Sequence, residues 1–473
     1  MSSAEDLVTM MRAEAEDVSA SIAGSDSSQQ IGCKNLRDGM VDRCTLNTMK
    51  MKQFCKLGLT ISTAALTLVG LPAIAKDWPQ FRGPERDGKS SEIGIVKSWE
   101  QQAPKLLWMG EGVGSGYAGV AVVGDMIYTT GNLRDGQGVV AVNAKDGKVV
   151  WSTVLTEGPP KHGFAGTRCT PTVAGEKMWV TTSNGLVACL STDGKVVWKK
   201  DFTTEWGGRM MSGWGFSESV LVDGQAAICT PGGPDAMMVA LDKDSGYVIW
   251  KCKVPELGKK GKDGAGYGSA VISMGAGVKQ YVQMTGRGVI GVRASDGKFL
   301  WAYNEVANKT ANIPMPVVSG DHVFCSTSYG TGSALLKLVR DGDGVKAEEV
   351  YFLSADDLQN HHGGMVLVDG HIHCGHGHNR GEPVCIELMT GKAKWGPVNA
   401  PGKGSAAVKY VDGHLIFRYQ DGLMALVEAN SEKFVLKGTF MPEFQEKESW
   451  AYPVVSGGRL YLREQDKLMC YEL

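Results

Sequence analysis

The phrase VVAVNAKDGKVVW, at Val139–Trp151, recurs three times further along the chain. The copies are LVACLSTDGKVVW at Leu186–Trp198, MVALDKDSGYVIW at Met238–Trp250 and VIGVRASDGKFLW at Val289–Trp301. Self-similarity at a period of roughly 40–50 residues is typical of β-propellers and solenoids, and it constrains the fold more than any shorter motif does. The repeat therefore decides the architecture before it says anything about function.

Each copy of the phrase predicts two antiparallel strands joined by a tight turn. The apolar run that ends near Ala141 forms one strand, Asp146-Gly147 makes the reversal, and the run that ends at Trp151 returns. Glycine accepts the positive φ that such a turn needs, and the closing tryptophan is large enough to lock one repeat onto the next. A second hairpin, such as Val120–Tyr128, precedes the phrase, so two hairpins make one four-stranded antiparallel blade.

Counting the first hairpins gives eight units. Their cores begin near Gly119, Pro171, Ser219, Ala270, Pro316, Met365, Ala407 and Pro453. The last unit ends after three strands, at Leu468–Leu473, while KLLW at Lys105–Trp108 looks like an unpaired strand with its own closing tryptophan. Pairing the two would leave no free sheet edge. We therefore predict an all-β fold, an eight-bladed β-propeller of four-stranded antiparallel blades over residues 105–473, closed by N- and C-terminal strands that share one blade.

The segment before the repeats divides into three parts. Met51–Lys76 has a basic start, an apolar stretch and a small-residue cleavage site at its end, which predicts a signal peptide at 51–75 and export to the periplasm or the cell exterior. The alternative is an uncleaved membrane anchor, the one case in which membrane association is expected. Residues 1–50 are polar and aperiodic, which indicates an over-extended reading frame or a disordered leader. Residues 76–104 form an N-terminal extension of the propeller.

Charge and cysteine content limit the possible partners. The 49 Lys+Arg residues balance 51 Asp+Glu residues, so neither nucleic acid nor an acidic membrane surface is implied as a partner. Cleavage after residue 75 would leave eight cysteines, and an oxidising compartment would permit disulfides whose connectivity the sequence leaves open. Cys385 and Cys470 fall in the repeat column of Ala141, which favours small buried thiols at both positions.

The phrases resemble the PQQ-like β-propeller repeat, A-x-D-x-x-T-G-x-x-x-W, over nearly all of residues 105–473. WPQFRGPERDG at Trp78–Gly88 looks like the N-terminal signature of an exported bacterial branch of that family. Asn360–Gly364 and Tyr329–Gly332 look like further signatures of the same branch. The resemblance implies a propeller fold and an exported protein, but it leaves the function of this branch undefined.

The resemblance brings in two functional classes. Quinoprotein alcohol dehydrogenases hold pyrroloquinoline quinone and Ca²⁺ at the propeller centre, whereas the outer-membrane protein assembly lipoprotein is a non-catalytic binding scaffold. The chain lacks the adjacent cysteine pair and the long insertions of the dehydrogenases, and it also lacks the lipobox cysteine of the assembly lipoprotein. The fold alone does not choose between an enzyme and a scaffold.

The sixth unit carries the densest group of candidate binding residues. In an antiparallel meander, the connections between blades and the loops between second and third strands emerge on one face. This rule brings Asn360–Gly363 and His376–Arg380 together at one corner of the channel mouth. Neutral imidazoles there could ligate Zn²⁺, Cu²⁺ or Fe²⁺, or they could bond loop carbonyls, and we expect them to titrate near neutrality. The candidates are His361, His362, His376, His378 and Arg380.

The same rule places Arg168, Trp214 and Arg287 on this face. Together with glycine-rich loops, they give the mouth cationic and aromatic side chains, which suits an anionic or sugar-like ligand. The alternative is that the arginines brace neighbouring carbonyl groups. No Ser-His-Asp order, GxSxG elbow or phosphate loop is recognisable, so the sequence offers no catalytic residues.

These observations lead to one functional prediction and one alternative. We predict an exported, non-catalytic binding or assembly scaffold that holds a protein segment or a small ligand at the channel mouth, with no cofactor committed and no metal assigned. The alternative is an alcohol or polyol dehydrogenase that depends on pyrroloquinoline quinone and calcium.

Overall fold

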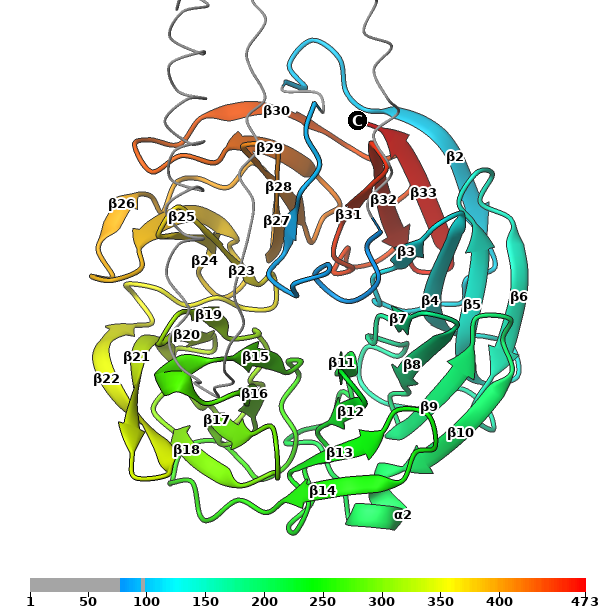
Figure 1. Cartoon of the computed structure of the whole chain (residues 1–473). Coiled ribbons are helices and arrows are strands. Elements are labelled where there is room, and N and C mark those ends of the chain that lie inside the picture. Colours follow the sequence, from blue (N-terminus) through cyan, green and yellow to red (C-terminus); the bar gives the residue numbers. More distant parts are fainter. Residues whose placement is uncertain (1–76, 95–97) are drawn as a thin grey trace, which may run out of the picture. The chain divides into compact units, whose positions relative to one another are not determined.

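The computed structural model describes residues 77–94 and 98–473. The described chain forms eight sheets arranged in a ring, as the blades of a propeller (Figure 1). Four strands that follow one another in sequence make up most blades, with the innermost strand first. The predicted all-β, eight-bladed fold is therefore confirmed. The predictions for residues 1–75, and for a mature chain that starts near Lys76, lie outside the described residues.

The first four blades begin within two residues of the predicted unit starts. Their strands are β3 (Ala121–Val123), β4 (Met126–Asn132), β5 (Gln137–Asn143), β6 (Val149–Val154), β7 (Thr172–Ala174), β8 (Lys177–Thr181), β9 (Leu186–Ser191), β10 (Val196–Asp201), β11 (Leu221–Asp223), β12 (Ala226–Cys229), β13 (Met238–Asp242), β14 (Val248–Cys252), β15 (Val271–Ser273), β16 (Gln280–Thr285), β17 (Gly288–Arg293) and β18 (Phe299–Tyr303). Within the described ranges, helix is limited to α2 (Phe202–Trp206) and one 3₁₀ turn, η1 (Gly275–Gly277).

The last four blades continue the same pattern around the ring. Their strands are β19 (Val317–Ser319), β20 (His322–Thr327), β21 (Gly332–Asp341), β22 (Gly344–Ser354), β23 (Met365–Val368), β24 (His371–His376), β25 (Glu382–Glu387), β26 (Ala393–Trp395), β27 (Ala406–Val411), β28 (His414–Tyr419), β29 (Met424–Glu428), β30 (Leu436–Phe440), β31 (Val454–Ser456), β32 (Arg459–Glu464) and β33 (Lys467–Glu472). Two strands come from the N-terminal side, β1 (Lys89–Ser90) and β2 (Lys105–Glu111).

The eighth blade is shared between the two ends of the described chain. β2 pairs antiparallel with β33, from Lys105 opposite Glu472 to Glu111 opposite Lys467, and the sheet order is β2-β33-β32-β31. β2 therefore supplies the outer strand that the last unit lacks. The predicted closure by a shared blade is confirmed, and it covers an edge of β33 that would otherwise be open to pairing with another chain.

The closing tryptophan of most phrases locks its blade onto the next one. Nε1 of Trp198, at the edge of the second blade, donates to the carbonyl of Lys243 in the third blade at 2.9 Å. Its ring also covers Gly246, the turn glycine of the third blade, where an added Cβ would lie 2.7 Å from the ring. Gly246 has a φ of +74°, so the turn needs glycine for its backbone as well as for space. The same arrangement recurs with Trp108, Trp151 and Trp250.

Trp301 departs from this pattern because the fifth blade lacks the repeat phrase. Nε1 of Trp301 donates within its own blade, to Oε1 of Gln280 at 2.6 Å. In the fifth blade, β21 and β22 continue as one long hairpin to a turn between Asp341 and Gly344. The Trp301 ring is instead buried in the cluster between the fourth and fifth blades, with Leu338 among its members.

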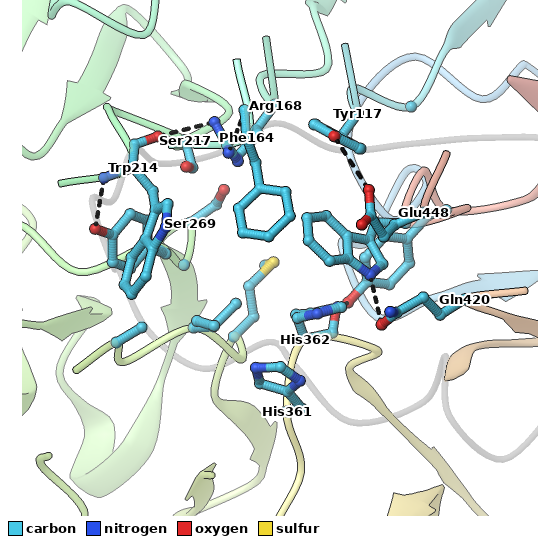
Figure 2. Close-up of a pocket in the computed structure, with 18 of the residues that line it drawn as sticks. Tyr117, Phe164, Arg168, Trp214, Ser217, Ser269, His361, His362, Gln420 and Glu448 are labelled. Atoms are coloured by element: carbon cyan, nitrogen blue, oxygen red, sulfur yellow. Dashed lines mark hydrogen bonds between the residues drawn. The ribbon is translucent and has the colours of Figure 1, made fainter. Parts of the chain in front are cut away.

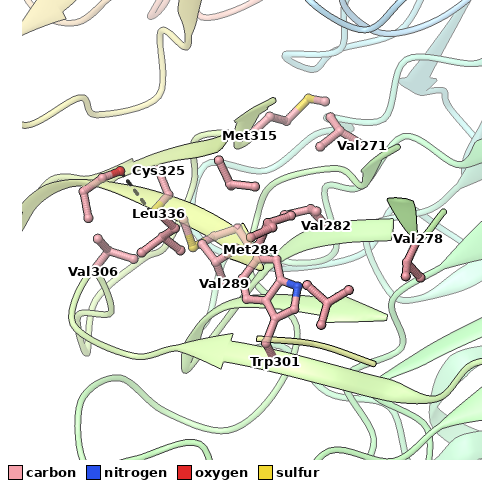
Figure 3. Packing of buried hydrophobic residues seen from close by; sticks show 14 residues of the cluster. Val271, Val278, Val282, Met284, Val289, Trp301, Val306, Met315, Cys325 and Leu336 are labelled. Atoms are coloured by element: carbon pink, nitrogen blue, oxygen red, sulfur yellow. Dashed lines mark hydrogen bonds between the residues drawn. The ribbon is translucent and has the colours of Figure 1, made fainter. Parts of the chain in front are cut away.

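The hydrophobic core lies between neighbouring blades. One cluster joins Met284 and Val289 of the fourth blade to Cys325 and Leu336 of the fifth (Figure 3). Each blade is sandwiched by two others, so its inner strands are buried on both faces and have continuous apolar runs, as in Val139–Val142. The core is therefore a ring of interfaces, each built from residues far apart in sequence.

Residues 77–94 link the inner strands of several blades. Trp78 exchanges two backbone hydrogen bonds with Val122 of β3, at 2.8 and 2.9 Å, and the Pro79 carbonyl accepts from the amide of Val173 in β7 at 2.8 Å. Further along the segment, β1 pairs parallel with β27 of the seventh blade. The WPQFRGPERDG motif therefore has a structural role, which is to cross from the first blades to the seventh.

Two buried arginines fix this segment. Nη2 of Arg86 donates to the carbonyl of Ser219 at 2.7 Å, and Nη1 donates to Val220 at 3.1 Å, next to the inner strand of the third blade. Arg82 donates to the carbonyl of Met365 in the sixth blade. These bonds satisfy carbonyls at the inner ends of blades on opposite sides of the ring, so the segment acts as a brace.

The eight described cysteines are all buried and unpaired. Cys385 and Cys470 are small buried thiols, as their repeat column predicts. Burial raises the pKa of both thiols to about 12, which keeps them protonated and unreactive. None of the helices in the described ranges has the length and apolar character needed to cross a membrane.

Candidate functional site

A cavity of about 310 Å³ lies where the loops of one propeller face converge (Figure 2). Its wall comes from connections that lead into blades and from loops between second and third strands, as the meander rule predicts. Its size is at the lower end of the range for small-molecule sites, roughly 300–1,000 Å³. The side chains that line it include Phe81, Tyr117, Phe164, Arg168, Trp214, Tyr267, Tyr329, His361, His362, His378, Gln420, Glu448 and Trp450.

Aromatic rings form two groups on opposite sides of the cavity (Figure 2). Trp214 and Tyr267 make one group, with ring centroids 5.9 Å apart. Trp450 is the centre of the other, with Tyr117 and Phe164 each 4.9 Å away. Phe164 is 47% exposed, so it stands at the opening of the cavity. The arrangement offers flat apolar surfaces to a ligand from two directions.

Arg168 braces the loops around the cavity. Nη1 donates to the carbonyl of Trp214 and Nη2 donates to that of Phe164, both at 2.8 Å, with longer bonds of 3.3 Å to two neighbouring glycine carbonyls. The guanidinium also lies 5.5 Å from the ring centroid of Tyr117. Burial lowers the pKa of Arg168 to about 10, which leaves it charged at neutral pH. Its donors are already used by the protein, so the bracing alternative describes it better than an anion-binding role does.

Three histidines of the sixth blade line one side of the cavity. The ring centroids of His361 and His378 are 4.3 Å apart, and those of His361 and His362 are 4.0 Å apart. Nδ1 of His361 pairs with Oγ of Ser405 at 2.7 Å, and Nε2 pairs with the hydroxyl of Tyr329 at 2.9 Å. Both ring nitrogens of His361 are therefore occupied by protein hydroxyls.

His361 and His362 do not titrate near neutrality, contrary to the sequence-based expectation. Burial, helped by the neighbouring His378, lowers the pKa of His361 to about 3. Burial also lowers the pKa of His362 well below its usual value and lowers that of His378. The physical reason is that a charged imidazole would lose its hydration here without gaining a carboxylate partner. The site is neutral on this side at physiological pH.

Three of the predicted residues lie outside the cavity wall. His376 is buried behind it, where Nδ1 accepts from the amide of Gln359 at 3.3 Å. Arg380 forms an ion pair with Glu382 at 3.2 Å, and Arg287 forms one with Asp263 at 2.7 Å. Of the eight predicted binding residues, the structure brings together His361, His362, His378, Arg168 and Trp214. The binding role of all eight stays a prediction.

Several residues of the cavity were missed by the sequence analysis. Tyr267 and Trp450 precede the first strands of the fourth and eighth blades, so the rule that located Arg168 would have found them. Phe164 and Glu448 lie further from the following strands, in the same connections as Arg168 and Trp450, at positions that no periodic signal marks. Glu448 accepts a long hydrogen bond of 3.5 Å from the Tyr117 hydroxyl, and burial, with the carboxylate adding to it, raises the pKa of Tyr117 to about 12.

The cavity does not fit pyrroloquinoline quinone with calcium. This quinone carries several carboxylates, which need free cationic donors, and the donors of Arg168 are bound to carbonyls. A calcium ion needs several oxygen ligands, and Glu448 is the one carboxylate of the wall. No cysteine belongs to the wall, and among residues 77–94 and 98–473 no three His, Cys, Asp or Glu side chains are placed to hold a metal together.

The fold and the repeat phrases define a propeller of the PQQ-like class. The family model described as "Outer membrane protein assembly factor BamB" matches residues 94–256 and 135–397. The matched region is more than half of the chain, so the chain belongs to this family. No curated protein matches the chain in sequence.

Solved structures confirm the architecture. Quinohemoprotein alcohol dehydrogenase from Comamonas testosteroni has 12% identity and a TM-score of 0.55, with 84% of this chain and 80% of that chain covered. A europium-containing methanol dehydrogenase has 12% identity and a TM-score of 0.54, with 82% and 89% covered. The computationally designed protein Ika8 has 9% identity and a TM-score of 0.54, with 78% and 100% covered. At these identities, the likeness concerns the fold alone.

Proposed function

We propose that this chain is an exported, non-catalytic binding scaffold that holds a protein segment or a small ligand in the cavity at the channel mouth. The observation that carries the proposal is the cavity itself, because it is concave and aromatic, and nearly every blade contributes side chains to its wall. Rigid strands hold its loops, and Arg168 ties its own loop to the loop of Trp214 through their carbonyls. Such preorganisation reduces the entropy cost of binding.

The chemistry of the wall favours binding over catalysis. His361 has both nitrogens engaged, and the hydroxyl beside Glu448 is that of Tyr117, whose pKa is raised to about 12, so that it stays protonated at neutral pH. Acid–base and nucleophilic catalysis need such pairs within hydrogen-bond reach. The aromatic rings, in contrast, supply the apolar contact area on which ligand and peptide sites depend.

Two further features support export and a protein partner. Met51–Ala75 has the pattern of a signal peptide. The matching family is that of an outer membrane protein assembly factor, which favours a protein that works outside the cytoplasm on other proteins.

The experiment is site-specific photo-crosslinking in the native host. A benzophenone amino acid replaces Phe164, at the opening of the cavity, and in a matched control it replaces Tyr247, which is 76% exposed on an outer edge. We expect adducts heavier than the chain from position 164 in the exported fraction, and their loss when Trp450→Ala is added. Equal adduct patterns from both positions would refute binding at the cavity.

A further inference from the structure

We propose that the occupant of this cavity is a neutral sugar ring, either free or at the end of a small glycan. This inference rests on the proposed binding function and goes one step beyond it, since it names the ligand class. Three observations carry it, namely the placement of the aromatic rings, the free polar groups beside Trp450 and the charge balance of the wall (Figure 2).

The aromatic rings provide the apolar half of a sugar site. A pyranose ring has a face of C–H groups that packs against a flat aromatic ring, and its hydroxyls point outward around the edge. Trp450 and Trp214 each present a half-buried indole to the cavity. The volume of about 310 Å³ accommodates one or two such rings and excludes a larger glycan body.

The polar groups beside Trp450 provide the other half. Nε1 of Trp450 donates to Oε1 of Gln420 at 3.0 Å, which fixes the orientation of the amide and leaves its Nε2 as a free donor. Glu448, two residues before Trp450, forms no ion pair in the described structure and has Oε1 as a free acceptor. A hydroxyl group donates and accepts at once, so neighbouring hydroxyls of a sugar can satisfy an amide donor and a carboxylate acceptor together.

The charge balance of the wall selects against ionic ligands. Glu448 would repel an anion, and the Arg168 donors that could compensate for it are bound to carbonyls. A cation would be repelled by the charged Arg168, which already lies over the Tyr117 ring. The three histidines are neutral. A buried charge without a partner is costly, so a neutral polyhydroxylated ligand matches this wall better than a phosphate, a sugar acid or a quaternary amine does.

The test is a set of titrations followed by calorimetry and by tryptophan fluorescence at pH 7.5. The probes are glucose, galactose, mannose, N-acetylglucosamine, maltose and cellobiose. Glucuronate is the anionic comparison ligand, and choline is the cationic one. We expect at least one neutral saccharide to bind, and glucuronate and choline to bind at least about tenfold more weakly. Trp450→Ala should weaken the saccharide about tenfold or more, since aromatic anchors dominate such sites.

Two additional variants keep the test informative if Trp450→Ala misfolds. Glu448→Gln keeps the shape but weakens the acceptor, and Gln420→Leu removes the donor, so each should weaken the saccharide about threefold to tenfold. Tyr247→Ala, on the outer edge, should leave affinity unchanged. Trp450-dependent binding of choline or glucuronate instead of any neutral saccharide would overturn the ligand class. If position 164 gives adducts but no saccharide binds, the ligand class is overturned and the binding function stands. If there are no adducts and no saccharide binds, both proposals are refuted.

Discussion

His361 shows how burial changes a side chain that the sequence presents as a titrating group. The sequence reveals two adjacent histidines and a third one near them in space, but it does not reveal that hydroxyls of Ser405 and Tyr329 occupy both nitrogens of the first. The imidazole is therefore a structural strut of the cavity wall. The energetic effect of this imidazole appears in the pH dependence of stability, because it binds a proton more tightly in the unfolded state than in the folded state.

This difference predicts an acid-sensitive contribution from His361. The pKa of His361 falls from 6.5 in the unfolded chain to about 3 in the folded one. Its contribution to the free energy of unfolding is therefore complete above pH 6.5 and is lost as pH falls toward 3. At pH 5 the loss amounts to about 2 kcal/mol. Urea unfolding at pH 7 and pH 5 should show that the wild type loses about 2 kcal/mol more than His361→Gln does. An identical loss in both proteins would contradict this account of the histidine cluster.

At the scale of elements, the contact between blades depends on the pair of a closing tryptophan and a turn glycine. Gly246→Ala would force a side chain into the left-handed region and into the Trp198 ring, 2.7 Å away. We expect a loss of about 3 kcal/mol in the free energy of unfolding, from backbone strain and displacement of the ring together.

Gly224→Ala is the matched control for this prediction. Gly224 also has a positive φ, +58°, but a Cβ there would meet nothing within 4 Å. The control should cost about 1 kcal/mol, the strain alone. Equal losses for the two variants in chemical denaturation would show that the tryptophan contact does not hold the blades together.

At the scale of the whole molecule, ring closure depends on β2. A chain that starts at residue 98 keeps β2 but lacks the brace of residues 77–94, whereas a chain that starts at residue 112 lacks both. We expect the second chain to aggregate, or to unfold at much lower denaturant concentration, because the edge of β33 is exposed. Analytical ultracentrifugation and urea unfolding compare the two. Similar behaviour of both chains would exclude the shared blade as a source of stability.

The architecture was predictable from sequence because the repeat is a local pattern. Unit starts at Ser219 and Met365 lie within two residues of β11 and β23, and the strand at Lys105–Trp108 pairs as expected. The candidate site was predictable only in part. Loop position placed His378 at the cavity, but Arg287 turns to Asp263, an ion pair that sequence spacing does not reveal.

Quinone reconstitution shows whether the channel mouth binds its ligand without redox catalysis. The purified protein is equilibrated with pyrroloquinoline quinone and Ca²⁺, freed of unbound quinone by gel filtration, and examined by absorption spectroscopy together with a dye-linked oxidation assay on alcohols and polyols. We expect no stoichiometric retention of quinone and no turnover, because the wall lacks free cationic donors and a second carboxylate. One quinone retained per chain, with turnover of any alcohol or polyol, would contradict this expectation and establish the dehydrogenase alternative.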